Sequence, residues 1–379
     1  SDKDQDVAVG PTTSVTEPRS WEHIAEAPLS DRSRPFAVWA GDRLVVWGGA
    51  LLTGGSLHPT DGAAWAPATG YWTPISVAPA GASTFGFAVW DGREVVVGPT
   101  EEDASAPWNV DASPADARYG LAAYDPAEDA WRYIAPVGSK ESFDTPRQAV
   151  VVGTKIYLAV RFVEPGGDSH DEDLIAYDIA TGASSTIPPG PFASSPYPDG
   201  SGEVSLTTVA GTIVAVPNWD LRPWVLNVDS LSWTQAQRPR SATSLHLMRA
   251  TWVASDRALM FESDGPSLRP WLFDPQQAEG DPWREGTPNP IDRARWDYEP
   301  VWSGRETFVP GAAYDPSKDT WREVPPPPRE AGQQRTLQSA WTGADLLLFG
   351  GEQYNCPDNA SCDRAATGPD RLDGWLLPV

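Results

Sequence analysis

The sequence predicts an all-β fold, because short apolar hairpins recur along it and no long helical periodicity appears. The first hairpin, 36–49 (FAVWAGDRLVVWGG), consists of two apolar strands joined by a tight turn at Gly41. Equivalent turns follow at intervals of about 50 residues, at Gly92, Gly153, Gly211, Ser255, Gly304 and Gly343. Hairpins repeating at this period are typical of β-propeller blades. The seven hairpins therefore predict seven blades.

A second repeat supports the same period. An aromatic residue and a tryptophan seven positions later flank a turn in Tyr124-Asp-Pro-Ala-Glu-Asp-Ala-Trp131 and in Tyr314-Asp-Pro-Ser-Lys-Asp-Thr-Trp321. Asp-Pro favours a tight turn, so the flanking aromatics should face each other across adjacent strands and fill the wedge between blades. One blade has Ser184 at the tryptophan position. The other rim tryptophans are expected to be largely buried between blades: Trp72, Trp131, Trp233, Trp283 and Trp321.

The two ends of the chain predict how the ring closes. Only one further strand, within 374–379, follows the last hairpin, so that blade lacks a fourth strand. Residues 20–25 contain Trp21 and look like an isolated fourth strand. The N-terminal strand should therefore complete the C-terminal blade. Residues 1–19 are polar and are expected to form a flexible leader, with residues 20–379 forming a single seven-bladed β-propeller domain.

A diglycine ends the second strand of two hairpins, at Gly48-Gly49 and Gly350-Gly351. With this diglycine, the blade period and the aromatic spacing, residues 20–379 resemble the kelch-repeat family. The galactose-oxidase-like enzymes share the fold of that family. Other hairpins depart from the diglycine, with Gly98-Pro99 or Pro310-Gly311 at this place. The resemblance implies a kelch-type propeller whose site lies on one face, around the central axis.

The formal net charge of −24 argues against nucleic acid as a partner, because a polyanion would be repelled. No apolar run is long enough to span a membrane. Cys356 and Cys362 are five residues apart, a spacing compatible with a small disulfide-closed loop. The alternative is two free thiols in a reducing compartment. With the polar leader, the disulfide interpretation predicts a secreted or cell-envelope protein.

Arginines recur where the chain enters the innermost strand of several blades: Arg34, Arg147, Arg249, Arg295 and Arg335. A guanidinium binds a carboxylate through two parallel hydrogen bonds, so a ring of arginines would favour a small anionic ligand. The alternative is that each arginine pairs with a neighbouring Asp or Glu. Aromatic residues in the same loops suggest that the ligand is a carbohydrate: Trp108, Trp219, Trp296, Tyr197 and Tyr354.

The sequence predicts no cofactor and no metal site. The acidic run 168–173 lacks EF-hand spacing and is expected to be a solvated loop, although calcium binding stays an alternative. The histidines in loops, His58, His170 and His246, come from different blades, which disfavours a three-histidine metal site. The copper-radical oxidases of this fold require a tyrosine linked to a cysteine, whereas both cysteines here lie in one short loop.

These observations predict a secreted or cell-envelope kelch propeller that binds a small anionic or carbohydrate ligand, or a protein partner. The alternative is a carbohydrate-active enzyme of the sugar mutarotase or polysaccharide lyase type, and whether the chain is an enzyme stays open. An enzyme should show arginines converging on a concave pocket with a Glu, Tyr or His at its floor. A binding module should show arginines held in ion pairs.

Overall fold

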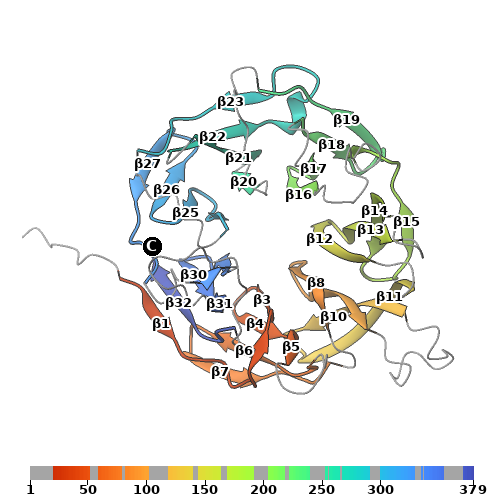
Figure 1. Ribbon diagram of the computed structural model, residues 1–379, viewed down its shortest axis with the longest axis vertical. Helices are drawn as coiled ribbons and strands as arrows, with labels where there is room; N and C mark the ends of the chain where they lie inside the picture. Colours follow the sequence, from red (N-terminus) through yellow and green to blue (C-terminus); the bar gives the residue numbers. More distant parts are fainter. Residues whose placement is uncertain are drawn as a thin grey trace, which may run out of the picture.

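The structure is a computed structural model, and it describes residues 20–51, 59–78, 82–101, 118–139, 144–163, 169–191, 204–217, 222–239, 252–254, 256–264, 267–290, 299–328, 334–335, 337–353 and 370–379. Within these residues the strands form seven four-stranded antiparallel sheets. Figure 1 shows the sheets as blades arranged in a ring, each running from the centre to the rim. Innermost strands of consecutive blades contact one another all the way round, including the last and the first. The predicted seven-bladed propeller is confirmed.

Six blades are continuous in sequence, and their strands run in chain order from centre to rim. Blade 1 has β3 (Phe36–Trp39), β4 (Leu44–Trp47), β6 (Gly62–Ala66) and β7 (Tyr71–Pro74). Blade 2 has β8 (Ala82–Trp90), β9 (Val95–Glu101), β10 (Arg118–Asp125) and β11 (Ala130–Ser139). Blade 3 has β12 (Asp144–Val152), β13 (Lys155–Val163), β14 (Ser169–Asp178) and β15 (Ser184–Thr186).

Blade 4 has β16 (Val204–Val209), β17 (Thr212–Pro217), β18 (Trp224–Asn227) and β19 (Ser232–Gln235). Blade 5 has β20 (Trp252–Ala254), β21 (Arg257–Asp264), β22 (Ser267–Phe273) and β23 (Trp283–Glu285), with the short 3-10 helix η3 (Pro275–Gln277) before β23. Blade 6 has β24 (Val301–Trp302), β25 (Thr307–Val309), β26 (Ala312–Asp315) and β27 (Thr320–Glu323).

Blade 7 joins the two ends of the chain. It consists of β29 (Gln338–Trp341), β30 (Asp345–Phe349), β32 (Gly374–Pro378) and, at the rim, β1 (Glu22–Ile24). Strand β1 pairs antiparallel with β32, with His23 opposite Trp375. The expected closure by the N-terminal strand is therefore observed. Residues 1–19 lie outside the described residues, so the leader stays a prediction.

The hairpin turns and the longer connections lie at opposite ends of the blades. The turn face carries the turns that join strand one to strand two and strand three to strand four of a blade. The loop face is the opposite end, where strand two joins strand three and where one blade joins the next. At the turns, Gly41, Gly92, Gly153, Gly211, Gly304 and Gly343 all have φ between 61° and 102°, a region that favours glycine. Ser255 lies outside the described residues. On the loop face, the acidic run 168–173, expected to be a loop, is strand from Ser169 onward, since His170 pairs with Phe162 and Asp173 with Val160.

Each rim tryptophan links its blade to the one before. Its indole Nε1 donates to a carbonyl oxygen of the preceding blade at 2.7–3.1 Å, with the pairs Trp21–Pro325, Trp72–Ala25, Trp131–Ser76, Trp233–Pro188, Trp283–Gln237 and Trp321–Thr287. The predicted facing of aromatics across the third and fourth strands is confirmed, for example Tyr124 opposite Trp131. The predicted burial of the rim tryptophans between blades is confirmed, since each packs against an apolar cluster shared by two neighbouring blades. Their third-strand partners are buried more deeply, and Tyr314 is fully buried.

Two-stranded ribbons extend blades 1 and 7 on the loop face: β2 (Arg32–Ser33) with β5 (Ala50–Leu51), and β28 (Gln334–Arg335) with β31 (Glu352–Gln353). The diglycine makes the first ribbon possible, since a Cβ on Gly49 would stand 2.6 Å from the Ser33 carbonyl oxygen. Arg32 is 0% exposed and donates to the carbonyl oxygens of Ser30 and Gly48 and to the Asp61 carboxylate. This arginine therefore holds together the segments at Ser30, Gly48 and Asp61 on the loop face of blade 1.

Candidate functional site

The predicted arginine set is described only in part. Arg34 lies between β2 and β3 with its side chain exposed, and its backbone N–H donates to Asp370 Oδ2 at 2.5 Å. Arg147 falls within β12 and Arg335 within β28, opposite Glu352, but their side chains lie outside the described residues. Arg249 and Arg295 lie outside them entirely. Convergence of these guanidiniums on the axis therefore stays a prediction.

Several other sequence candidates also lie outside the described residues. They are Cys356, Cys362, the loop aromatics named above, His58, His246, and the side chains of His170 and the acidic run. His23 is described, and it lies on β1 with its Nε2 2.7 Å from Asp373 Oδ2. Within the described ranges, no group of three or more His, Cys, Asp and Glu side chains is placed to hold a metal ion. The same ranges contain no helix long and apolar enough to cross a membrane.

A cavity of about 630 Å³ opens between blades 6 and 7 on the turn face. Blades 1 to 6 each connect their third and fourth strands here, blade 5 through η3 and the others by a turn, but β32 and β1 come from opposite ends of the chain. We call this joint the seam and its cavity the seam pocket. The pocket is lined by Ser303, Arg305, Glu306, Arg322, Val324, Pro325, Trp341, Gly343, Ala344, Leu377, Pro378 and Val379.

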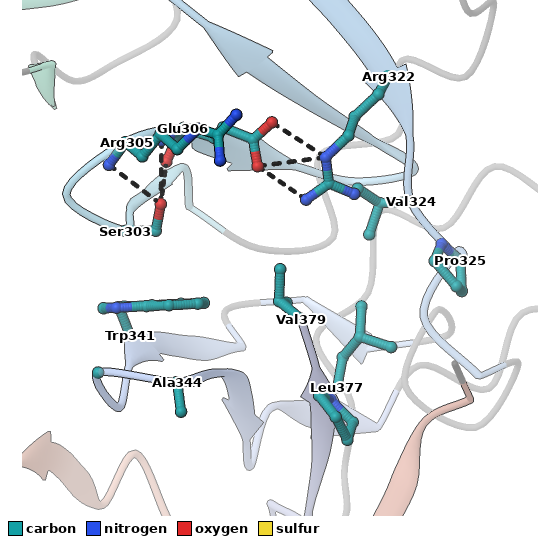
Figure 2. A pocket seen from close by; sticks show the side chains of 12 residues that line it. Ser303, Arg305, Glu306, Arg322, Val324, Pro325, Trp341, Ala344, Leu377 and Val379 are labelled. Carbon is teal, nitrogen blue, oxygen red and sulfur yellow. Dashed lines mark hydrogen bonds and ion pairs between the residues drawn. The ribbon is translucent and has the colours of Figure 1, made fainter. Parts of the chain in front are cut away.

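One wall of the seam pocket is polar and comes from blade 6. The turn after β24 is built by Ser303, whose Oγ accepts the backbone N–H of Glu306 at 3.0 Å. This turn places Arg305 and Glu306 side by side, and Figure 2 shows them on the same side of the pocket as Arg322. Arg322 donates to the Glu306 carboxylate at 2.8–3.2 Å through Nε and one terminal nitrogen. The Glu306 side chain is only 15% exposed, and both of its carboxylate oxygens accept from Arg322.

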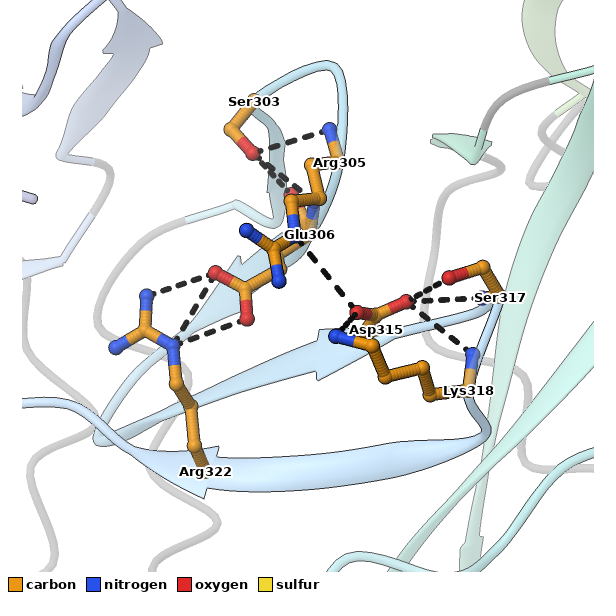
Figure 3. Close-up of polar contacts among 7 residues, drawn as sticks. All are labelled: Ser303, Arg305, Glu306, Asp315, Ser317, Lys318 and Arg322. Atoms are coloured by element: carbon orange, nitrogen blue, oxygen red, sulfur yellow. Dashed lines mark hydrogen bonds and ion pairs between the residues drawn. The ribbon is translucent and has the colours of Figure 1, made fainter.

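Arg305 is held more loosely. Its side chain is 71% exposed, and its Nε lies 3.8 Å from Asp315 Oδ2, beyond hydrogen-bond distance. Asp315 is satisfied by other groups, since its carboxylate accepts from Ser317 and lies 3.1 Å from Lys318 Nζ (Figure 3). Burial raises the pKa of Asp315, but the hydrogen bonds from Ser317 and Lys318 outweigh burial and lower that pKa to about 2. Arg305 can therefore turn toward a ligand at little cost.

The opposite wall is aromatic and apolar and comes from blade 7. Trp341 closes the first strand of that blade and stacks on Phe308 of blade 6, with ring centroids 5.6 Å apart and planes 12° apart. Because Phe308 is fully buried, this stacking holds the indole in place. In Figure 2 Trp341 and Val379 face the polar wall across the pocket, and Leu377 lies beside Val379. The pocket thus offers a fixed flat ring opposite a guanidinium.

Sequence reasoning missed the seam pocket and Arg32. A signal for part of the pocket was present, because a Glu follows the turn arginine in blades 2 and 6, as Arg93-Glu94 and Arg305-Glu306. In both blades an Arg directly after the rim tryptophan pairs with that Glu, and Arg132 bonds Glu94 at 2.5–2.8 Å. Nothing in the repeat marks Trp341 as a wall of the same cavity, since it comes from the next blade.

Comparison with known proteins gives no closer assignment. No protein-family model matches the chain, and no curated protein matches it significantly. The seven-bladed propeller is the observed fold. The kelch label rests on the repeat period and the diglycines.

Proposed function

We propose that this chain is a secreted or cell-envelope kelch-type propeller that binds a small anionic ligand, one bearing a carboxylate, without transforming it. The observation that carries the proposal is the polar wall of the seam pocket. Its one carboxylate, Glu306, is locked by Arg322, while Arg305 is open to solvent. A carboxylate that accepts several charge-assisted hydrogen bonds is a poor general base. An open guanidinium is a good contact for an anion.

The net charge of −24 sharpens this proposal. A strongly acidic protein repels anions at long range, so an anion site needs local positive charge. Arg305 supplies it in the seam pocket, and the five arginines of the loop face stay proposed as a second positive centre. A sugar carboxylate remains within this class of ligand, and a protein partner would present an Asp or Glu side chain.

The test is isothermal titration of the whole chain with small carboxylates and their neutral analogues. Glucuronate with glucose, and phenylacetate with phenylacetamide, are suitable pairs. We expect at least one acid to bind and its neutral analogue to bind at least about tenfold more weakly, since a hydrogen bond to a charged group contributes roughly 1.5–3 kcal/mol. Affinity should fall as salt rises. Equal affinity for acids and neutral analogues, or chemical turnover of a bound acid, would defeat the proposal.

The compartment is proposed from the sequence alone, on the Cys356–Cys362 spacing and the polar residues 1–19. Mass spectrometry of the protein from its producing cells tests it. We expect the two thiols to be oxidised to a disulfide and the protein to be outside the cytoplasmic fraction. Reduced thiols in a cytoplasmic fraction would contradict the assignment.

A further inference from the structure

We infer that the seam pocket is a site for an aromatic carboxylate, with the ligand's ring stacked on Trp341 and its carboxylate paired with Arg305. This inference rests on the proposed binding function and assigns it a place and a ligand chemistry. It also places the site away from the loop face, where the repeat alone would put it.

The first step is why a cavity exists at this joint. At the joint of blades 1 and 2, the turn residue Asp129 accepts from the backbone N–H and the hydroxyl of Ser76. At the joint of blades 5 and 6, Asp319 does the same with Thr287. At the seam no turn joins β32 to β1, and the corresponding residue is Pro325, which has no N–H to satisfy. Among the described residues, no turn therefore occupies the place at the seam that a turn occupies at these two joints.

The second step is the shape and polarity of that place. A volume of about 630 Å³ lies within the range of small-molecule pockets. More than half of the lining residues are apolar or aromatic, and they come mainly from β32 and the turn after β29. Phe308 of blade 6 covers part of the Trp341 indole and Arg322 lies over the Phe308 ring, so a ligand ring would stack on the part of the indole that Phe308 leaves open to the pocket. This favours an aromatic body over a heavily hydroxylated one.

The third step is charge. Glu306 is neutralised by Arg322, so the polar wall does not repel an anion as an unpaired carboxylate would. Arg305 projects its guanidinium from the same wall, and its ion-pair partner Asp315 keeps Ser317 and Lys318 when Arg305 moves. Binding therefore replaces the exposed 3.8 Å contact between Arg305 and Asp315 with a charge-assisted hydrogen bond from Arg305 to the ligand carboxylate.

The fourth step is a consequence for the ring. The walls come from blade 6 on one side and from β29, the turn after β29, and β32 of blade 7 on the other. A ligand that bridges them binds only the closed seam, so it should raise the melting temperature as its concentration rises.

The experiment is isothermal titration of the full chain with phenylacetate, phenylacetamide, acetate and glucuronate. We expect phenylacetate to bind at least about tenfold more tightly than each of the other three. Arg305→Gln and Trp341→Leu should each weaken phenylacetate at least about tenfold, whereas Trp341→Phe should keep most of the affinity. The matched control is Arg93→Gln, because Arg93 occupies the same turn position in blade 2 and pairs with Asp125.

The outcomes separate the inference from the proposed function. If an acid binds but Arg305→Gln weakens it no more than Arg93→Gln does, the seam site is wrong and the binding function stands. If glucuronate binds more tightly than phenylacetate, the ligand class is wrong. If no acid binds, both fail. Melting curves of each variant show whether a lost affinity is only lost folding.

Discussion

The joint between blades 5 and 6 and the seam between blades 6 and 7 use the same indole contact but differ in everything around it. At the first, Trp321 donates to Thr287, while Asp319 accepts from Thr287 and from the buried Tyr314 hydroxyl at 2.7 Å. At the seam, Trp21 donates to Pro325 and no turn stands beside it. The seam pocket thus lies at the joint where no described turn connects the third and fourth strands of a blade.

On the loop face, ion pairs and hydrogen bonds hold the two ends of the chain together at the seam. Arg371 donates to both carboxylate oxygens of Asp373, which also bonds His23 of β1, and the Arg371 guanidinium lies 5.2 Å from the Trp375 ring centroid. Asp370 accepts from the backbone N–H of Arg34 and donates its own to the Arg32 carbonyl oxygen. The ends of the chain are therefore held on the face opposite the seam pocket, which leaves the turn face free.

The other joints show that the residues on the two sides are matched. The position that faces the turn residue is Ser76 or Thr287 where that residue is Asp129 or Asp319. It is Ala25 or Ala135 where the turn residue is glycine, at Gly70 and Gly182. A Cβ on Gly182 would stand 2.2 Å from the Ile134 carbonyl oxygen, so this joint closes by contact instead of by hydrogen bonds. Two joints thus pair a Ser or Thr donor with an Asp acceptor, and the joint at Gly182 has neither side chain.

The largest expected effect is at the complete joint. Trp321→Ala should lower the free energy of unfolding by about 3 kcal/mol, because the indole packs on Tyr314 and Phe261 and loses its bond to Thr287. Trp21→Ala at the seam should cost less, about 1–2 kcal/mol. Urea unfolding of both variants measures the difference. Equal losses would show that the hydrogen bonds between Asp319 and Thr287 add no stability to the joint.

The matching of residues across a joint can be tested by converting one joint into another. Ser76→Ala and Asp129→Gly together reproduce the Ala135 and Gly182 pair. Each single change should cost about 1–2 kcal/mol, and the double variant should cost about 1 kcal/mol less than their sum. Asp129→Gly combined with Thr287→Ala joins two different joints and serves as the control, which should be additive. Additivity within the joint as well would refute the matching.

Low pH should lower the stability of both the joint between blades 5 and 6 and the seam. Burial raises the pKa values of Asp319 and Asp373, but hydrogen bonds outweigh it and hold both below the ordinary value. A carboxyl whose pKa is lowered by folding stabilises the protein above its unfolded pKa, about 4, and loses that effect as the pH falls through the folded pKa. Stability should thus decline below about pH 4. For Asp315 the window reaches down to about 2.

The variants Asp319→Asn and Asp373→Asn assign that decline to one region each. Each should be less stable than the natural chain at pH 7 and show a shallower loss below pH 4, as followed by melting curves between pH 2 and 7. The exposed Asp256→Asn is the control. An unchanged acid profile in Asp373→Asn would mean that the seam is not held by this carboxylate.

The smallest effect on stability should come from the pocket arginine. Arg305→Gln should change the free energy of unfolding by less than about 0.5 kcal/mol, because an exposed and distant ion pair contributes little. Arg93→Gln should behave alike. A loss above about 1 kcal/mol in Arg305→Gln would indicate that the guanidinium is part of the joint and not free to meet a ligand.

The sequence predicts the ring well because each blade repeats local signals. Hairpin turns with glycine, and pairs such as Tyr124 and Trp131, lie within ten residues of each other and obey strand periodicity. Closure by Trp21's strand follows from counting strands. The burial of the rim tryptophans also follows from the repeat, whereas the carbonyl oxygens of the preceding blade that their Nε1 atoms bond do not.

The candidate site is harder to predict because its residues belong to different blades. Arg305 and Trp341 are far apart in sequence, and only ring geometry places them across one cavity. Arg32 is buried although arginine is ordinarily exposed, so its burial depends on the carbonyl oxygens that the diglycine ribbon brings near. The five arginines chosen from the sequence share a position in the repeat, which is a different property from sharing a site.

The most direct test of the account is amide hydrogen exchange, followed by mass spectrometry, with and without phenylacetate. Without ligand, the amides of residues 22–24 that bond to β32 should exchange slowly, since β1 is paired with it. With ligand, exchange should slow further in residues 22–24, 301–309, 338–349 and 374–378, and stay unchanged in blades 2 and 3. Fast exchange of residues 22–24 in both states, or ligand protection confined to other blades, would contradict a closed seam that carries the binding site.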